Sequence, residues 1–180
     1  MRRHIYVTDY DMAWPNLFLR EKSAVWEVLG SNCVAIHHIG STAVPGMVAR
    51  SVIDLLVEVC DLDQVASVRG GLDFLGYDWL GARGVPGCIC LVKQRGMDDV
   101  VEDMCHLRVF EGGGPQATRH LAVRDYLCAH ADVAVEYGEL KRGLAERFPY
   151  DPEGYLAGKD AYACSLERAA LAWSAASGLR

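Results

Sequence analysis

The sequence has no lysine- or arginine-rich block, and its 18 lysines and arginines are outnumbered by 24 aspartates and glutamates. Sequence-independent binding of nucleic acid needs a concentrated basic face, so we expect no nucleic-acid partner. No apolar run approaches the roughly 18 residues of a membrane span, and the N-terminal residues lack the apolar core of a signal peptide. We therefore expect a cytoplasmic protein that does not enter a membrane.

The seven cysteines include no Cys-x-x-Cys pair, the spacing that is typical of structural zinc sites. A zinc site would have to combine Cys88 and Cys90 with Cys105 and His106, but the first two lie in a strand-like run. Most of the cysteines have apolar neighbours, as reduced core thiols do. We expect no zinc, no disulfide bridge, and burial of most of the set, which comprises Cys33, Cys60, Cys88, Cys90, Cys105, Cys128 and Cys164.

The glycine-rich segment 111–115 is not followed by Gly-Lys-Ser/Thr, which excludes a phosphate loop of the Walker type. We interpret it as the link between a sheet and a helical part. The length of 180 residues, with 51% hydrophobic residues, suits a single domain with a full core. The sheet-containing part would cover residues 1–110 and the helical part residues 116–177.

Hydrophobic periodicity predicts the individual elements of this domain. Helices are expected at 14–29, 62–75, 116–129, 131–147 and 152–177, and strands at 33–39, 51–59, 77–80, 88–92 and 100–110. Turns are expected at 81–87 and 95–99. The last three strands follow one another without helices, so they should pair antiparallel. The predicted fold class is therefore α/β (α+β) with a mixed sheet.

The most informative polar residues lie around the first two strands. The first strand ends at Gly40 and Ser41, and the second carries Asp54 in an otherwise apolar run. Burial of a lone carboxylate is costly, so Asp54 requires a metal, a base or a cluster of hydrogen bonds. Gly40 allows the backbone to approach a ligand closely, and the hydroxyls and amides of Ser41 and Thr42 can face phosphate oxygens.

The segment from His38 to Gly46, HIGSTAVPG, followed by Ile53 and Asp54, closely resembles the signature of the GrpB family. Further matches at 121–127, 137–144 and 155–159 extend the resemblance over nearly the whole chain. The family looks like a branch of the DNA polymerase β-like nucleotidyltransferases, whose mark is a Gly-Ser turn followed by a strand with Asp-x-Asp or Asp-x-Glu. The resemblance implies a nucleotidyltransferase-like fold with a helical C-terminal part.

The resemblance also implies an activity and a set of functional residues. The activity would be transfer of a nucleotidyl group from a nucleoside triphosphate to an unknown small molecule. Asp54 would bind Mg²⁺, and His38 or His106 would act as the base. The expected ligand is a small anion, a nucleotide or phosphate ester. The residues implied in binding its phosphates are Gly40, Ser41, Thr42, Arg50, Arg108, Arg124, Lys141 and Lys159.

The second carboxylate of the superfamily signature is missing, because Asp54 is followed by two leucines. Glu58 shares a strand face with Asp54 but lies about 13 Å further along the strand. Two metal ions in one site are only about 4 Å apart, so Glu58 cannot complete the cluster. A carboxylate could instead come from the neighbouring strand, where Glu102 and Asp103 precede His106.

In the family this neighbouring strand usually carries His-x-His, and Arg108 takes the place of the second histidine. The two-residue period of a strand puts His106 and Arg108 on one face, and we expect these two, rather than Glu102 or Asp103, beside Asp54. A fixed cation at this place attracts phosphate and repels Mg²⁺. The sequence therefore leaves three functions open: nucleotidyl transfer, binding of a nucleotide or anion without turnover, and phosphate-ester chemistry with one metal or none.

Overall fold

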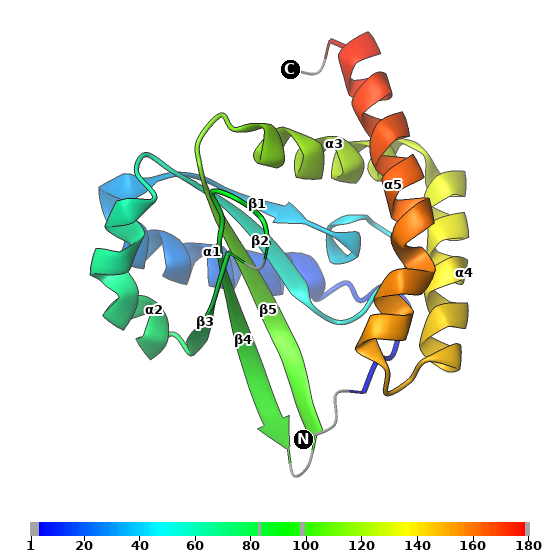
Figure 1. Ribbon diagram of the computed structural model, residues 1–180, viewed down its shortest axis with the longest axis horizontal. Coiled ribbons are helices and arrows are strands. Elements are labelled where there is room, and N and C mark those ends of the chain that lie inside the picture. The colour runs from blue at the N-terminus through cyan, green and yellow to red at the C-terminus, as the bar shows by residue number, and fades with distance from the viewer. Residues whose placement is uncertain (1–3, 83, 98–99, 179–180) are drawn as a thin grey trace.

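The computed structural model describes residues 4–82, 84–97 and 100–178, and in this part the strands form one five-stranded sheet (Figure 1). The strands are β1 (Cys33–Ile39), β2 (Ile53–Val59), β3 (Tyr77–Gly81), β4 (Ile89–Met97) and β5 (Val100–Glu111). Their order across the sheet is β1-β2-β5-β4-β3. Only the β2–β5 pair is parallel among these neighbours, so the predicted mixed sheet is confirmed.

The helices divide between the two faces of the sheet and one of its ends (Figure 1). Helices α1 (Trp14–Leu29) and α2 (Arg69–Phe74) pack on one face, and α3 (Pro115–Ala129) packs on the other. Helices α4 (Ala131–Arg147) and α5 (Pro152–Ala176) stand beside the end of β1. No helix within the described ranges combines the length and the apolar character that crossing a membrane requires.

The single helix predicted at 62–75 is wrong. The chain forms a 3-10 turn, Asp63–Val68, and then the short helix α2. Two adjacent glycines weaken this segment, and one of them has a packing role. A side chain on Gly71 would place its Cβ 2.8 Å from Val28 of α1, so the glycine allows the two helices to approach closely.

Strand β2 is apolar because both of its faces are covered. On one face Leu55 and Val57 pack with residues of α1, and on the other Leu56 packs with Ile39 and Leu121. Asp54 interrupts this run, and its backbone lies between Ile39 of β1 and His106 of β5. Asp54 therefore lies on an interior strand, which pairs with β1 on one side and with β5 on the other.

Two predicted strand boundaries differ from the structure by more than one residue. Strand β2 begins at Ile53 rather than at residue 51, and β4 continues to Met97 rather than ending at residue 92. The extension of β4 arises because it pairs with β5 over its whole length. Residues 98 and 99 of the predicted turn at 95–99, and residue 83 of the turn at 81–87, lie outside the described residues.

A β-bulge in β5 decides which side chains face the same way. Lys93 of β4 is paired with Cys105, but the next residue, Gln94, is paired with Asp103. Met104 is therefore the extra residue of the bulge, and the alternation of side chains shifts by one at this point. Asp103 consequently shares a face with His106, three residues further on, whereas a regular strand would place the two on opposite faces.

All seven cysteines are free, as predicted. The expectation that most are buried is wrong, since only Cys33, Cys88 and Cys105 are buried. These three lie in or beside strands, where the sheet is covered on both faces. Cys60, Cys128 and Cys164 are exposed, because they lie at the end of β2 and on outward positions of α3 and α5.

Candidate functional site

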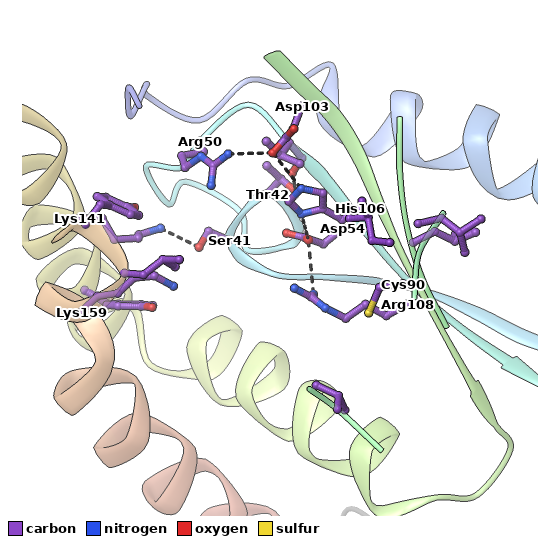
Figure 2. A pocket seen from close by; sticks show the side chains of 18 residues that line it. Ser41, Thr42, Arg50, Asp54, Cys90, Asp103, His106, Arg108, Lys141 and Lys159 are labelled. Atoms are coloured by element: carbon purple, nitrogen blue, oxygen red, sulfur yellow. Dashed lines mark hydrogen bonds and ion pairs between the residues drawn. The ribbon is translucent and has the colours of Figure 1, made fainter. Parts of the chain in front are cut away.

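A cavity of about 420 Å³ lies between the sheet and the C-terminal helices (Figure 2). This volume falls in the range of small-molecule sites. Strands β2 and β5 supply its floor, and α4 and α5 supply one wall. Most of the residues that the sequence singled out line it, namely Ser41, Thr42, Arg50, Asp54, His106, Arg108, Lys141 and Lys159.

Gly40 makes room for the carboxylate of Asp54. Its backbone has φ 72° and ψ −174°, a conformation that is essentially restricted to glycine. A Cβ at this position would lie 2.6 Å from Asp54 Oδ2. Gly40 is not among the residues that line the cavity, so it supports the site through Asp54 rather than through the predicted contact with phosphate.

The carboxylate of Asp54 is held by two cations of β5. Its Oδ1 accepts hydrogen bonds from His106 Nδ1 at 3.1 Å and from Arg108 Nη1 at 3.4 Å. Burial alone would raise the pKa of Asp54, but the hydrogen bond from His106 and the charge of Arg108 lower it to about 2. Asp54 is therefore ionised, and the expected geometry, with His106 and Arg108 beside it, is confirmed.

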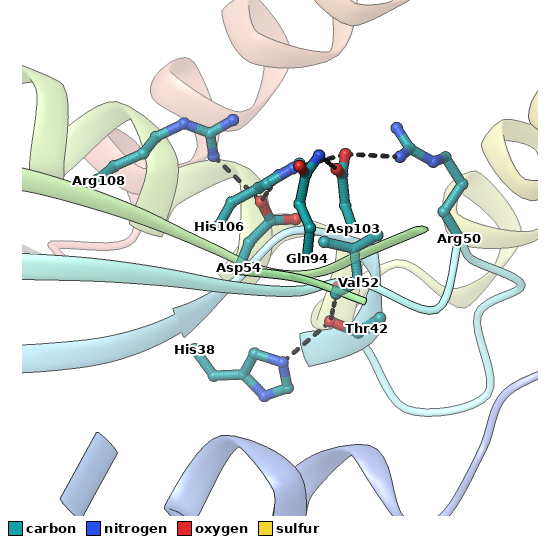
Figure 3. A network of polar contacts seen from close by, with 9 residues as sticks. All are labelled: His38, Thr42, Arg50, Val52, Asp54, Gln94, Asp103, His106 and Arg108. Carbon is teal, nitrogen blue, oxygen red and sulfur yellow. Dashed lines mark hydrogen bonds and ion pairs between the residues drawn. The ribbon is translucent and has the colours of Figure 1, made fainter. Parts of the chain in front are cut away.

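His106 lies between two carboxylates (Figure 3). Besides the bond to Asp54, its Nε2 lies 3.1 Å from Oδ2 of Asp103. Both ring nitrogens can donate only when the ring is protonated. Burial lowers the pKa of His106, but the two carboxylates outweigh this and raise it to about 9. A ring that is already protonated at neutral pH has no free lone pair with which to accept a further proton. His106 in this state does not fit the predicted role of a base.

Asp103 is the main polar residue of the site that the sequence-based set of site residues omits. Its side chain is only 1% exposed. Besides His106, it accepts hydrogen bonds from Gln94 Nε2 at 2.7 Å and from Arg50 Nη2 at 3.4 Å. The bulge at Met104 brings Asp103 to the face of the sheet that carries His106. No residue pattern in the sequence predicts this bulge. The side chain of Glu102, the other predicted source of a carboxylate, lies outside the described residues.

Two lysines of the C-terminal helices line the side of the cavity opposite the sheet (Figure 2). Lys141 of α4 is only 4% exposed, and its Nζ donates to Ser41 Oγ at 2.6 Å and to the carbonyl of Val48 at 2.9 Å. Burial and the charge of Lys159 lower the pKa of Lys141 to about 7. Burial also lowers the pKa of Lys159.

The structure places His38 outside the cavity, on the face of the sheet opposite to Asp54 (Figure 3). Its ring stacks on Phe18 of α1, with centroids 4.6 Å apart. The hydroxyl of Thr42 donates to the carbonyl of Val52, so His38 Nε2, 3.0 Å away, must donate to that hydroxyl. Burial lowers the pKa of His38 to about 4, which keeps the ring neutral. His38 therefore positions the turn, and the role of base predicted for it does not fit this geometry.

Arg124 of α3 also lies away from the cavity. Its Nη1 donates to the carbonyl of His38 at 3.2 Å, and its Nε donates to Asp125 at 2.7 Å. The contact with His38 ties α3 to the end of β1. The predicted contact of Arg124 with phosphate is therefore not available in this arrangement.

The rest of the cavity wall is largely apolar, and the set of predicted site residues did not include it. Leu80 and Val85 come from the β3–β4 region, and Tyr137, Tyr155 and Leu156 come from α4 and α5. Tyr137 and Tyr155 are the first residues of two segments that resemble the GrpB family. The sequence therefore held a signal that these two residues belong to the site. No comparable signal marks Leu80 or Val85.

The described residues do not fit a magnesium site. Asp54 Oδ1 accepts from two cationic donors, and its Oδ2 lies over Gly40. Both carboxylate oxygens of Asp103 accept hydrogen bonds from neighbouring side chains. No group of three or more His, Cys, Asp or Glu residues in the described part of the chain is arranged to hold a metal ion. The polar arrangement is instead suited to an anion, because Mg²⁺ would meet His106 and Arg108 in front of Asp54.

The comparisons with known proteins agree with the resemblance in the sequence. The model of a family described as GrpB protein matches residues 4–168. UPF0157 protein YqkA of Bacillus subtilis is 35% identical over 96% of this chain, which spans about half (49%) of that relative's length. Glutamate-rich protein GrpB of Alkalihalophilus pseudofirmus is 33% identical, and the match covers 84% of this chain and 87% of that protein.

Two solved structures have a fold similar to that of this chain. The crystal structure of conserved protein GrpB from Enterococcus faecalis has a TM-score of 0.84 at 34% identity, and the match covers 92% of this chain and 96% of that one. The Cid1 poly(U) polymerase has a TM-score of 0.51 at 9% identity over 79% of this chain and 43% of that one, a likeness of fold alone. The predicted polymerase β-like nucleotidyltransferase fold is thus confirmed, and this chain belongs to the GrpB family.

Proposed function

We propose that the cavity binds the phosphate groups of a small ligand, a nucleotide, and does so without a metal ion. The observation that carries the proposal is the pairing of Asp54 with His106 and Arg108. This pairing cancels the negative charge that a divalent cation would need. Arg50, Arg108 and Lys159 line the same cavity and leave it with a cationic balance.

The cations are placed to share a phosphate chain. Arg108 lies on the sheet side of the cavity and Lys159 on the helix side, with Ser41 between them (Figure 2). Among the described residues Arg50 donates one long bond, of 3.4 Å, to Asp103, which leaves most of its guanidinium donors for a ligand. Charge-assisted bonds to phosphate oxygens are about twice as strong as neutral ones. The apolar wall, with Leu80 and Leu156, would contact the rest of the ligand.

Nucleotidyl transfer is the second candidate function, and one observation favours it. Asp54 and Asp103 reach the same histidine from one face of the sheet, so two carboxylates are present in one site. The family fold supports this candidate as well. His106 nevertheless occupies the space between the two carboxylates, which makes binding without turnover the better-supported function.

Substitution of two arginines tests the binding site directly. Arg108→Ala should weaken ATP binding about tenfold or more, because it removes a cation from the cavity. Arg124→Ala should leave the affinity within about twofold, because Arg124 is occupied by His38 and Asp125. Isothermal titration calorimetry with ATP measures both, and circular dichroism confirms that each variant is folded. Equal losses in the two variants, or an unchanged affinity in Arg108→Ala, would contradict the proposed site.

A further inference from the structure

The hydrogen bonds of Lys141 match a neutral amine. A neutral amine has two N–H groups, and Lys141 Nζ donates to two acceptors, Ser41 Oγ and the carbonyl of Val48. A protonated amine has a third N–H group. Within the described residues this third group would have only the ring of Tyr137, whose centroid lies 5.1 Å from Nζ. Lys141 is only 4% exposed, so an acceptor for the third N–H group would have to come from the cavity that this lysine lines.

The charges around Lys141 also oppose a further proton while the cavity is empty. Lys159 of α5 and Arg50 of the loop before β2 are cations that lower the pKa of Lys141, and Asp54 of β2 is the carboxylate that raises it. Arg50 is partly balanced by its ion pair with Asp103. Asp54 is already paired with two cations of β5. The phenols of Tyr137 and Tyr155, from α4 and α5, carry no charge at neutral pH, because burial raises the pKa of both. A bound phosphate would reverse this balance.

We propose that Lys141 is neutral in the empty cavity and takes up a proton when an anion binds, so that ligand binding is coupled to proton uptake. The added N–H group then has a phosphate oxygen as its acceptor. This inference rests on the proposed function, because it concerns the same cavity. The lowering of the pKa of Lys141 to about 7 by burial and by Lys159 is consistent with it.

Proton uptake can be counted by isothermal titration calorimetry with ATP at pH 8.0 in EDTA, in several buffers of different ionisation enthalpy. At pH 8.0 His106, with a pKa of about 9, already holds its proton. At this pH the phosphates of ATP are fully ionised, because their last pKa lies near 6 to 7, so a proton taken up belongs to the protein. We expect uptake of about one proton per ATP. The affinity should fall by up to about tenfold per pH unit above pH 7.5.

Two variants test whether the proton that is taken up binds to Lys141. Lys141→Arg keeps a permanent charge and should bind ATP without proton uptake. Arg142→Gln changes the next residue of α4, an exposed cation paired with Asp9, and should take up the proton as the natural protein does. Uptake that persists in Lys141→Arg would overturn the inference, because the proton would then belong to another group.

A measurement on the free protein keeps the inference testable if Lys141→Arg does not fold. The chain has only four lysines, Lys22, Lys93, Lys141 and Lys159. Their ¹³Cε signals in lysine-labelled protein can be followed by NMR against pH, with Lys22→Arg and Lys159→Arg as assignment aids. Lys141 should titrate with a midpoint near 7. A midpoint near 10.5 would overturn the inference.

The two proposals fail in different ways. ATP binding in EDTA without proton uptake would overturn the coupling at Lys141 and leave the proposed function in place. Absence of ATP binding would overturn the proposed function, and the NMR midpoint of Lys141 would then decide whether the amine is neutral in the empty cavity.

Discussion

Gly40→Ala should lower the free energy of unfolding by on the order of 3 kcal/mol and remove ATP binding. The backbone conformation of Gly40, with φ 72° and ψ −174°, costs about 1–3 kcal/mol for any other residue. The new Cβ would also lie 2.6 Å from Asp54 Oδ2, which is too close for a real contact. Asp54 would have to leave His106 and Arg108, so the change should disturb the site as well as the turn.

Gly46→Ala is the matched control for this prediction. Gly46 also has a positive φ, 77°, but a Cβ there would meet nothing within 4 Å. Its substitution should therefore lower stability by about 1 kcal/mol and leave ATP affinity unchanged. Thermal and urea unfolding of the two variants, followed by circular dichroism, gives the comparison. Equal destabilisation by both would mean that the contact with Asp54 has no energetic consequence.

Asp103→Asn should lower the free energy of unfolding by about 3 kcal/mol. The side chain is almost fully buried and balances the charges of Arg50 and His106. Asparagine keeps the shape but removes the charge, and its amide would compete with donors that now share two carboxylate oxygens. The pKa of His106 should fall as well, because Asp103 is one of the two carboxylates that raise it. Urea unfolding and the NMR titration of the histidine ring measure these effects.

Asp9→Asn provides the control for Asp103→Asn. Asp9 forms an ion pair with Arg142 at 2.7 Å, but the side chain of Asp9 is 89% exposed. Exposed ion pairs contribute about 0–1 kcal/mol, so the variant should be nearly as stable as the natural protein. A loss at Asp103 no larger than the loss at Asp9 would show that the network around His106 contributes little to stability.

The arrangement of the sheet follows from the sequence because it depends on long apolar patterns. The run around Asp54 is apolar on both faces, which predicts an interior strand. The three strands predicted between residues 77 and 110 follow one another without a predicted helix, which predicts the antiparallel part of the sheet. The helix predicted at 62–75 failed because a periodic pattern does not distinguish the 3-10 turns of 63–68 from an α-helix, and because it does not show that Gly71 approaches Val28 closely.

The cavity could be predicted in part, because the turn after β1 and the face of His106 and Arg108 follow from residue spacing. Three features could not. The bulge at Met104 changes the face of Asp103, and local alternation does not reveal it. The register of β1 places His38 opposite Leu55, on the face covered by α1. The burial of Lys141 depends on how α4 packs beside the turn, whereas a lysine on a helix is usually exposed.

The affinity for ATP, measured by isothermal titration calorimetry in EDTA and in excess Mg²⁺, tests the central claim most directly, with Asp54→Asn measured alongside. If His106 and Arg108 neutralise Asp54, and Arg50, Arg108 and Lys159 bind phosphate, the natural protein should bind ATP in EDTA, within about threefold of its affinity in Mg²⁺. Asp54→Asn should bind at least as tightly, because it frees Arg108. Binding that requires Mg²⁺ and is lost in Asp54→Asn would contradict the account and restore metal-dependent transfer.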